Sequence, residues 1–345
     1  MSKKNLIFIY PKLYTFIHTE IKLLSDEFNL ISITQNWERK TLLPFNLIRQ
    51  VIFLVINIRK VDTILISFGG YWSFFPALFS NLLAKKVAIV MHGTDCVSFP
   101  EIEYGNLRNP ILSFVTKKSL QWASIILPVS ESLVYTENNY YSSKTLKFGY
   151  NYHLSNIKTP YKVIHNGLNI LDWVRDNEII RNKTSFVTVL GEGKIKIKGV
   201  DLIIEVASRF PNSIFYLAGI ENVKGYNIPK NIICKGRLTP EELKVLFNQS
   251  QFYLQLSNTE GFGVALCEAM LCECIPLVSD VNFLPNIIGD SGFVLNKRNS
   301  DMLVDLINMA LNSDIIHLEQ KARKRIKDNF SVNKRKKMLL SVLTN

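Results

Sequence analysis

The chain has few cysteines and no stretch of strongly biased composition. It contains 5 Cys, 16 Gly and 12 Pro among 345 residues, which excludes collagen-like and disordered proteins because those classes need far more glycine, proline or charge. No internal repeat with a period of about 20–50 residues is visible. The cysteines are odd in number and three of them lie in the apolar segment 267–274, so they do not fit a disulfide framework and favour a reducing compartment.

Candidate metal ligands are also scarce. Cys272 and Cys274 are separated by one residue, but neither a second cysteine pair nor a neighbouring histidine completes the four ligands of a structural zinc site. We interpret these cysteines as buried thiols and predict no metal site. A nicotinamide-binding unit needs Gly-x-Gly-x-x-Gly after its first strand, and residues 191–193 hold only a fragment of that motif, so we predict no bound cofactor.

The chain has fewer acidic residues than basic ones. Lys and Arg number 41 against 29 Asp and Glu, which gives a net charge of +12 and favours anionic partners. Residues 1–170 hold 18 Lys and Arg against 10 Asp and Glu, so most of the excess lies in the first half. The basic residues are not interleaved with aromatic ones in any recognisable nucleic-acid module, and we therefore expect no nucleic-acid partner.

One uncharged run, residues 63–84, has about the length of a membrane span. Glycines and Pro76 interrupt it, so we predict a buried strand over 63–68, a glycine turn and an apolar helix over 73–84. The apolar run 6–10 is too short for a signal peptide. We expect a cytoplasmic protein that associates peripherally with anionic lipid at the inner face of the cytoplasmic membrane, through the 73–84 helix and the adjacent Lys85 and Lys86.

Short apolar runs alternate with longer helical patterns along the chain. Most runs are continuously apolar, as in parallel strands covered on both faces, and the alternation predicts a doubly wound α/β architecture. A helix over 241–250 is predicted to begin with a capping box formed by Thr239 and Glu242. The predicted strands cover residues 5–10, 30–34, 63–68, 87–91, 125–129, 162–165, 186–190, 214–218, 232–235, 252–256 and 275–279.

The length of the chain favours two domains, because a single hydrophobic core stops growing at about 250–300 residues. We assign residues 1–167 to an N-terminal Rossmann-like domain and residues 168–328 to a C-terminal Rossmann-like domain. Residues 329–345 are expected to form a helix that packs back on the first domain. Two such domains facing across a cleft would place a ligand at the carboxyl ends of their strands.

The most informative segment is 257–270, which follows a predicted strand and opens a helix near Gly263 or Val264. Its Gly-Phe-Gly turn and the unpaired amides of the helix start form an anion site suited to phosphate. Glu260 precedes that site, and Glu268 lies about 7 Å further along the helix axis. Each carboxylate can accept hydrogen bonds from a diol, as a sugar nucleotide would require. Spacing alone equally allows a capping Glu260 and a solvated Glu268.

This segment resembles the Glu-x₇-Glu motif of retaining glycosyltransferases of the GT-B fold, in particular family 4. Residues 190–201, which contain Leu-Gly-Glu and Lys-Gly-Val-Asp, resemble the family's Gly-Arg…Lys-Gly-x-Asp loop, and residues 235–243 resemble the loop that frames the nucleobase. His-Gly-Thr-Asp at 92–95 and Val-Ile-His-Asn-Gly at 163–167 resemble the acceptor-side histidine loop and the linker. The C-terminal domain carries the strongest part of the resemblance. The resemblance implies that this domain, residues 168–328, binds the nucleotide sugar and that the N-terminal domain, residues 1–167, lies on the acceptor side.

The resemblance implies a role for each matching residue. Three are catalytic candidates: Glu260 would hold hydroxyls of the donor sugar, Lys198 would neutralise the diphosphate, and His92 would face the transferred sugar and the acceptor. Glu268 would hold the ribose. The other donor-binding candidates, which would contact the sugar, the phosphates or the base, are Gly191, Lys194, Arg237, Gly261, Phe262, Gly263 and Val264.

The chain departs from the family pattern at several positions. Glu192 stands where a diphosphate-binding Arg is usual, Asn286 where a Glu is common, and Cys274 where a Gly is common; no Gly-rich turn follows the first strand. We expect the missing positive charge to come from the lysines of loop 193–198. In an extended loop, Lys194, Lys196 and Lys198 would all point to the same side.

The resemblance implies a hexosyltransferase-type enzyme that uses a UDP- or GDP-sugar. It would transfer the sugar with retention and without a metal ion to a glycan or lipid-linked acceptor, in the biosynthesis of cell-surface polysaccharide or lipopolysaccharide. The departures leave two alternatives open: a non-catalytic nucleotide-sugar-binding subunit of a glycosyltransferase complex, and a sugar-nucleotide epimerase on the same fold. A non-catalytic subunit would bind nucleotide without transfer, whereas an epimerase would turn over the donor without an acceptor.

Overall fold

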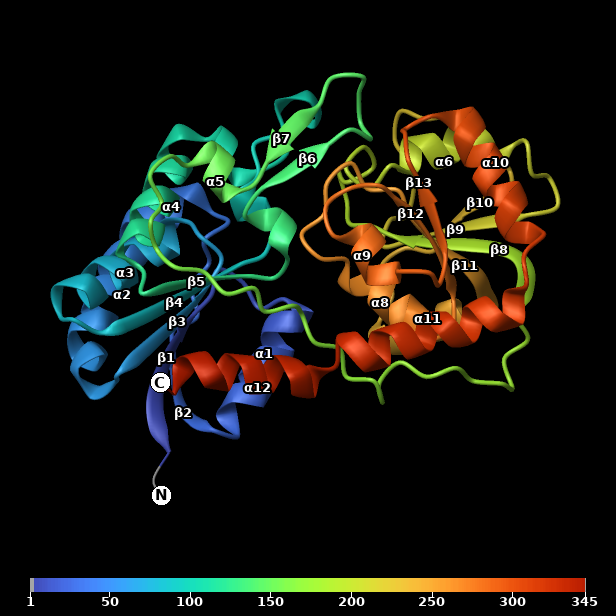
Figure 1. Cartoon of the computed structure of the whole chain (residues 1–345). Helices are drawn as coiled ribbons and strands as arrows, with labels where there is room; N and C mark the ends of the chain where they lie inside the picture. Colours follow the sequence, from blue (N-terminus) through green and yellow to red (C-terminus); the bar gives the residue numbers. More distant parts are fainter. Residues whose placement is uncertain (1–2, 345) are drawn as a thin grey trace. The chain divides into compact units, whose positions relative to one another are not determined.

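The computed structural model describes residues 3–344, which divide into two compact units (Figure 1). Unit 1 comprises Met1–Thr136, Lys147–Asn166 and Arg335–Asn345, and unit 2 comprises Glu137–Leu146 and Gly167–Lys334. Segment 137–146 therefore groups with unit 2, although it lies before the expected boundary near Gly167. The end of the chain groups with unit 1.

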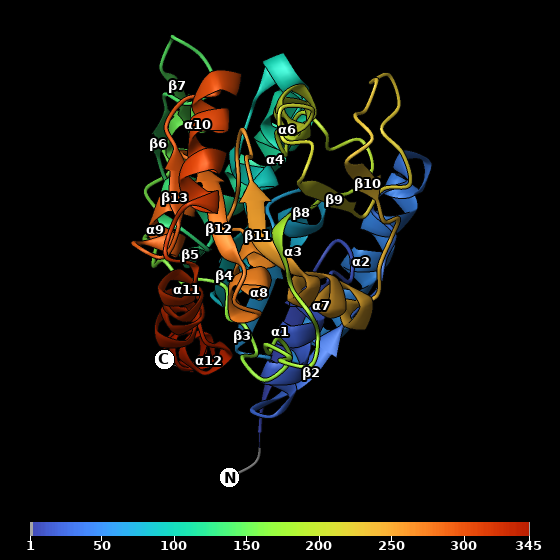
Figure 2. The ribbon, with the colours of Figure 1, turned by 90° about the vertical axis from the view of Figure 1, so that its right-hand side faces the viewer.

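Unit 1 is built on a five-stranded parallel sheet with the order β2-β1-β3-β4-β5. All residues of β3 and nearly all of β4 are buried, because helices cover both faces of the sheet (Figure 2). The strands are β1 (Lys4–Ile9), β2 (Phe28–Ser32), β3 (Thr63–Ser67), β4 (Lys86–Met91) and β5 (Ile125–Pro128). The helices are α1 (Thr15–Ser25), α2 (Leu43–Asn57), α3 (Tyr71–Leu82), α4 (Pro110–Trp122) and α5 (Tyr150–His153).

The strand predicted over 162–165 does not form, and this prediction was wrong. The segment runs beside β5, with the Lys162 amide donating to the Ile126 carbonyl and the Ile164 amide donating to the Pro128 carbonyl. Pro128 has no amide hydrogen to return such a bond, so the ladder stays incomplete. A parallel bridge between Ile126 and Tyr161 is the pairing that remains.

Unit 2 contains a six-stranded sheet with the order β10-β9-β8-β11-β12-β13, again with parallel pairing. The predicted parallel α/β architecture is thus confirmed in both units. The strands are β8 (Asn182–Val189), β9 (Ile214–Ala218), β10 (Ile232–Cys234), β11 (Ser250–Gln255), β12 (Ile275–Ser279) and β13 (Phe293–Leu295). The helices are α6 (Val200–Ala207), α7 (Pro240–Gln249), α8 (Val264–Leu271), α9 (Leu284–Ile288), α10 (Ser300–Leu311) and α11 (Ile315–Asn329).

Sequence patterns missed only very short strands. These are β13 and the two-stranded pair β6 (Thr136–Asn138) and β7 (Leu146–Phe148), each of three residues, too short for a periodic pattern to register. Short 3₁₀ turns complete the connections at Lys40–Leu42, Ile58–Lys60, Thr94–Cys96, Pro100–Ile102, Asn106–Arg108 and Glu131–Leu133.

The predicted start of one helix has a direct counterpart. The start of α7 is a capping box in which the Glu242 amide donates to Thr239 Oγ1 at 3.2 Å and the Thr239 amide donates to Glu242 Oε2 at 2.8 Å, as predicted. Within residues 3–344, no helix combines the length and apolar character that crossing a bilayer requires.

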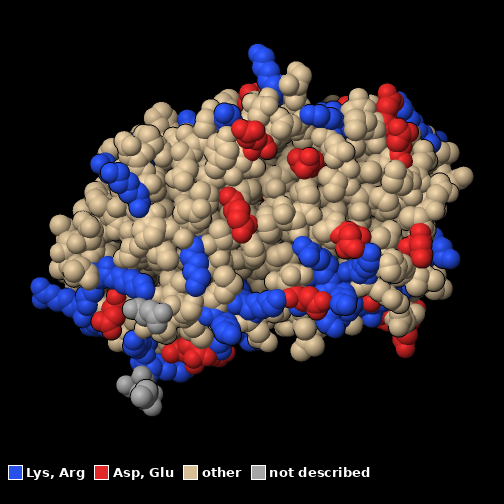
Figure 3. All heavy atoms as spheres, viewed as in Figure 1, with Lys and Arg blue, Asp and Glu red and all other residues tan. Residues whose placement is uncertain are grey.

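The chain ends in α12 (Val332–Leu343), whose Arg335 is buried in unit 1. The Arg335 guanidinium lies 3.0 and 3.2 Å from the two carboxylate oxygens of Glu20 on α1, and it also donates to the carbonyls of Ile164 and His165. These bonds connect the end of the chain to unit 1. Lys and Arg side chains gather over α11 and over α12 in Figure 3.

Candidate functional site

The strongest candidate site of unit 2 lies at the carboxyl ends of β8 and β11. The strand order reverses there, because β9 and β10 extend the sheet on one side of β8 while β11, β12 and β13 extend it on the other. Open α/β sheets bind ligands at such a switch point. The loop after β8 ends at Lys198 and Gly199, and the loop after β11 carries Glu260 into α8.

Glu260 is the centre of a hydrogen-bonded cluster. Its Oε2 lies 2.5 Å from Lys198 Nζ and accepts from Gln255 Nε2 at 2.7 Å and from Ser257 Oγ at 3.1 Å. The buried Tyr253 hydroxyl donates to Gln255 Oε1, which orients the amide of Gln255 toward Glu260. No residue among 3–344 bonds Glu260 Oε1, so this oxygen is available to accept from a sugar hydroxyl.

Backbone packing brings the two loops together. A Cβ at Gly199, whose φ is +66°, would lie 2.0 Å from the Leu256 carbonyl oxygen, so only glycine fits this close approach. The Asn258 amide donates to the Ile197 carbonyl at 2.8 Å, and Asn258 Nδ2 donates to the Lys196 carbonyl at 2.6 Å. The Lys198–Glu260 ion pair is therefore held by the backbone as well as by its own charges.

Two residues that hold the motif loop in place were not predicted from the sequence. Asn282 accepts the Glu260 amide at 2.9 Å through Oδ1 and so orients the motif loop. Asn138, from the segment 137–146, donates through Nδ2 to the Asn258 carbonyl at 2.8 Å. Neither position has a signal in the sequence, because each acts through a contact between segments far apart along the chain.

The loop that follows β8 is not extended, and the prediction of three lysines on one side was wrong. The Lys198 amide donates to the Lys194 carbonyl at 2.9 Å, and the Val200 amide donates to the Ile195 carbonyl at 3.0 Å, so residues 194–200 form successive turns. A four-residue spacing places Lys194 on the same face as Lys198, whereas Lys196 points elsewhere. Lys194 and Lys196 are exposed, and Lys198 is half-buried.

Glu268 lies on α8, which begins at Val264 directly after Gly263, as predicted. Its side chain is half-buried, and no residue among 3–344 donates a hydrogen bond to it. Burial raises the pKa of Glu268 from 4.5 to about 8. Burial without a partner is unfavourable for a carboxylate, so the group is poised to accept donors that a ligand would bring.

The remaining donor-side candidates share this sheet edge but differ in exposure. Phe262 is buried against Phe283 and Phe330, at ring centroid distances of 6.2 and 5.4 Å, and so anchors the turn whose amides start α8. Gly191 follows β8 and Arg237 follows β10, and both are exposed. Gly261 and Val264 are half-buried on either side of Gly263, which is buried.

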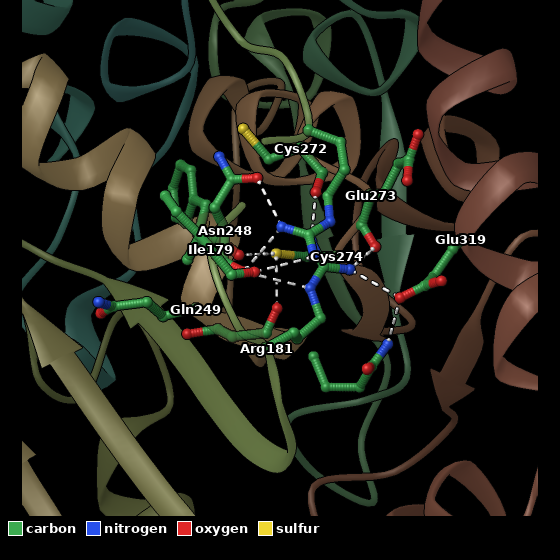
Figure 4. Close-up of polar contacts among 12 residues, drawn as sticks. Ile179, Arg181, Asn248, Gln249, Cys272, Glu273, Cys274 and Glu319 are labelled. Atoms are coloured by element: carbon green, nitrogen blue, oxygen red, sulfur yellow. Dashed lines mark hydrogen bonds and ion pairs between the residues drawn. The ribbon is translucent and has the colours of Figure 1, made fainter. Parts of the chain in front are cut away.

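The opposite end of α8 is fixed by arginines. Arg181 donates through Nη2 to the Cys272 carbonyl at 2.6 Å and through Nη1 to the Glu273 carbonyl at 2.8 Å, and it pairs with Glu319 at 2.7 Å (Figure 4). Positive charge at a helix C-terminus stabilises the helix. Cys272 and Cys274 are buried in this cluster as thiols. Across residues 3–344, no group of three or more His, Cys, Asp or Glu side chains is arranged to hold a metal ion.

His92 occupies the corresponding edge of unit 1, directly after β4. Its Nε2 lies 2.8 Å from Ser67 Oγ, and its ring lies 4.3 Å from the Phe68 ring and 4.8 Å from the Phe16 ring, measured between centroids. Burial, followed by the positive charge of Arg335, holds the pKa of His92 well below its usual range. The imidazole is therefore neutral at physiological pH and can donate or accept a hydrogen bond.

Asp95 organises the loop that carries His92. The buried Asp95 carboxylate accepts the amides of His92, Gly93 and Gly69 at 3.1, 2.9 and 2.9 Å, which ties the loop after β4 to the loop after β3. Burial raises the pKa of Asp95, while these three amide bonds lower it. Phe68 in the second loop has a φ of +65°, a strained value for a bulky residue and one that concentrates at functional sites.

Beside His92 lies an aromatic pocket of about 160 Å³ within unit 1. It sits at the carboxyl ends of β1 and β3, where the strand order of this sheet also reverses. The Trp72 indole donates to the carbonyls of Ser67 and Phe68, which fixes one wall. Lys12 and Glu38 form a 2.7 Å ion pair among the lining residues. The aromatic residues that line the pocket are Tyr14, Trp37, Phe68 and Trp72.

Comparison with known proteins gives a family match for the part of the chain that carries the Lys198–Glu260 cluster. Residues 174–330 match the family model of glycosyl transferases group 1. This group 1 segment contains Lys198, Glu260 and Glu268, and it lies within unit 2.

Several curated proteins are similar to parts of the chain. A GDP-mannose:cellobiosyl-diphosphopolyprenol alpha-mannosyltransferase of Xanthomonas oryzae is 35% identical over 77 residues, which is 21% of this chain and 20% of that protein. A serotype-specific mannosyltransferase of Escherichia coli is 28% identical over 126 residues, 34% of this chain and 16% of that protein. The alpha-galactosylglucosyldiacylglycerol synthase of Streptococcus pneumoniae is 25% identical over 166 residues, 42% of this chain and 44% of that protein. The matches thus span less than half the length of these relatives.

Solved structures resemble nearly the whole chain. Sucrose-phosphate synthase from Thermosynechococcus elongatus superimposes with a TM-score of 0.77 at 13% identity, covering 99% of this chain and 98% of that one. Anabaena HepE, solved in complex with UDP and glucose, superimposes with a TM-score of 0.75 at 15% identity over all of both chains. The fold is that of the GT-B glycosyltransferases, as predicted.

Proposed function

We propose that the chain is a glycosyltransferase that transfers a sugar from a nucleotide-diphosphate sugar with retention at the anomeric carbon. The observation that supports this most directly is the Lys198–Glu260 ion pair beside the start of α8, within the segment that matches glycosyl transferases group 1. HepE was solved with UDP and glucose, and the Xanthomonas relative is named for GDP-mannose. A UDP- or GDP-sugar is therefore the proposed donor.

The proposed roles follow from the chemistry of each group. Expelling a diphosphate leaves negative charge, which Lys198 Nζ and the amides at the start of α8, a helix start that no side chain among residues 3–344 caps, would stabilise electrostatically. Glu260 Oε1 would accept hydroxyls of the transferred sugar, and Glu268 would accept those of the ribose. Lys194, one turn from Lys198, would add a second positive charge, and Arg237 would lie beside the base. Because cationic groups of the chain itself serve the leaving group, we propose that transfer does not depend on a divalent metal ion.

The acceptor side of the proposal rests on unit 1. His92 is neutral and half-buried next to the aromatic pocket, where it would contact the transferred sugar and the acceptor. Aromatic faces such as Trp37 and Tyr14 pack well against the apolar faces of sugar rings. Relatives are named for a diphosphopolyprenol acceptor, for serotype-specific mannosyl transfer and for a glycolipid synthase. We therefore propose a glycan or lipid-linked acceptor, cell-surface polysaccharide or lipopolysaccharide biosynthesis, and action at the inner face of the cytoplasmic membrane.

The test begins with a thermal-shift screen of the purified chain against UDP-, GDP- and ADP-sugars, because a ligand that binds the folded state raises the melting temperature. Transfer with the identified donor is then assayed in EDTA, and the anomeric configuration of the product is read by NMR. We expect transfer with retention. An inverted product would exclude the retaining mechanism. Donor turnover without acceptor would indicate an epimerase, and binding without transfer a non-catalytic subunit.

Variants assign the roles. Lys198→Ala should lower kcat at least 100-fold, because it removes a charge that matters most in the transition state, while the exposed Lys324→Ala on α11 serves as control. Trp37→Ala should raise the acceptor KM and leave the donor affinity unchanged. Wild-type turnover by the Lys198→Ala variant would show that Lys198 has no role in the mechanism.

A further inference from the structure

Helix α2 in unit 1 presents an apolar face to solvent. Its side chains at positions i, i+3, i+7, i+10 and i+11 are all exposed, although such a stripe is normally the buried face of a helix. The exposed fractions are 62% for Phe45, 62% for Ile48, 55% for Ile52, 60% for Val55 and 57% for Ile56.

The inward face of α2 begins with polar side chains. The buried stripe runs through Asn46, Gln50 and Leu54. Asn46 Nδ2 donates to the Asn36 carbonyl at 2.7 Å, and Gln50 Nε2 donates to the Trp72 carbonyl at 3.0 Å. These bonds fix the rotation of the helix about its axis, so the apolar face stays outward.

The charged residues of the segment that contains α2 are of one sign. Residues 39–61 contain five Lys or Arg and no Asp or Glu. Arg49 is exposed and lies next to Phe45 and Ile52 on the helix surface, and Arg59 follows Val55 and Ile56 by one turn. An outward apolar stripe bordered by basic residues is the pattern of an interfacial helix that enters the headgroup region of an anionic bilayer.

The apolar helix expected to dock at the membrane is placed differently. Helix α3 packs between α2 and α4 (Figure 2), and its Trp72, Pro76 and Ala77 are buried. Leu82 and Leu83, at its end, are exposed. Of these two helices, α2 therefore exposes the larger apolar surface to solvent, and the sequence analysis did not single it out.

We propose that the outer face of α2 docks unit 1 onto the surface of an anionic lipid bilayer. This inference deepens the proposed action at the membrane and takes its biological meaning from the proposed lipid-linked acceptor. A second copy of the chain is a poorer occupant, because two identical faces would bring their basic residues together without acidic partners.

The test uses the full chain and vesicles of defined composition. Sedimentation with phosphatidylcholine vesicles containing phosphatidylglycerol should pellet the wild type, and pure phosphatidylcholine should not. Raising the salt should weaken the binding. The double variant Ile48→Asp/Ile52→Asp should lower the vesicle affinity at least tenfold. Since both side chains are exposed, we expect the fold to be retained, as judged by the melting temperature and its shift with donor.

A matched control tests whether binding depends on where the two isoleucines lie and not only on replacing isoleucine by aspartate. Ile180→Asp/Ile316→Asp also replaces two exposed isoleucines, in unit 2, and should bind vesicles like the wild type. Arg49→Ala should lower binding severalfold and reduce its salt dependence. Absence of wild-type binding to anionic vesicles at low salt would overturn the inference, as would wild-type binding by the α2 double variant. A dimer in solution that the α2 substitutions dissociate would assign the face to a second copy and would also overturn it.

Vesicle binding and sugar transfer are separate readouts. Vesicle binding without any nucleotide-sugar binding would refute the proposed function and leave the docking face in place. Nucleotide-sugar binding and transfer without vesicle binding would refute the docking face alone.

Discussion

Glu268→Gln tests whether an unpartnered, half-buried carboxylate is part of the donor site. The substitution keeps the size and one acceptor oxygen of the side chain but removes its ionisation. In the wild type, burial raises the pKa of Glu268 from 4.5 to about 8, and no residue among 3–344 donates a bond that would compensate the charge. The variant should therefore change stability and donor binding in different directions.

The sign of the stability effect follows from linkage. Below the unfolded-state pKa of 4.5, Glu268 is protonated in both states and costs nothing. As the pH rises from 4.5 to about 8, the unfolded state ionises while the folded state resists, so the wild type loses stability. At about 1.4 kcal/mol per pH unit, the loss is at most about 5 kcal/mol. Because the side chain retains contact with water, we expect roughly 2 kcal/mol.

The assay is thermal unfolding of wild type and Glu268→Gln between pH 5 and pH 9. Unit 2 has roughly 180 residues, and a domain of that size shifts by about 2–4 °C per kcal/mol. The variant should melt about 4–8 °C above the wild type at pH 9 and close to it at pH 5. Glu205→Gln, an exposed carboxylate on α6, is the control and should shift little at either pH.

Donor binding should change in the opposite direction. Ribose hydroxyls donate to an ionised carboxylate better than to a protonated one, so wild-type affinity for the nucleotide sugar should rise with pH and level off above the pKa of about 8. The affinity of the Glu268→Gln variant for the nucleotide sugar should be weaker than that of the wild type and independent of pH over this range. Parallel melting curves for the two proteins at every pH, together with equal donor affinities, would refute the assigned environment and the assigned role.

Three further predictions concern the framework of the site. Gly199→Ala should lower donor affinity at least tenfold in a nucleotide-sugar titration, because its Cβ would lie 2.0 Å from the Leu256 carbonyl oxygen. Unchanged affinity would show that donor binding does not require the close approach of the loops after β8 and β11. Glu20→Ala should lower the free energy of unfolding measured in urea by about 3–5 kcal/mol, since it leaves the buried Arg335 charge unpaired; a loss below 1 kcal/mol would contradict this. Thr239→Ala should cost about 1 kcal/mol in the same assay and leave transfer intact, and a loss of activity would show that the cap does more than start α7.

The sequence by itself was sufficient for the α/β architecture and for the helix start that follows the Glu260 motif. Continuously apolar runs predict parallel strands, because a strand that is covered on both faces has no polar side. The capping box of α7 and the Gly-Phe-Gly start of α8 were also predictable, since each depends on residues close together in the chain. Lys198 and Glu260 were each singled out only by resemblance to a family, and their ion pair was not predicted, because 62 residues separate them.

The tertiary structure decided what depends on contacts between distant segments. The turns of loop 194–200 replace the extended form because Asn258 bonds its carbonyls, and Asn282 orients Glu260 from another loop. The pKa of Glu268 depends on how deeply α8 is buried, which no local pattern reports. Helix α2 is apolar around most of its circumference, so its sequence does not show which face is covered. Two side-chain amide bonds, from Asn46 and Gln50, turn the isoleucines outward, and they exist only once the sheet and α3 are in place.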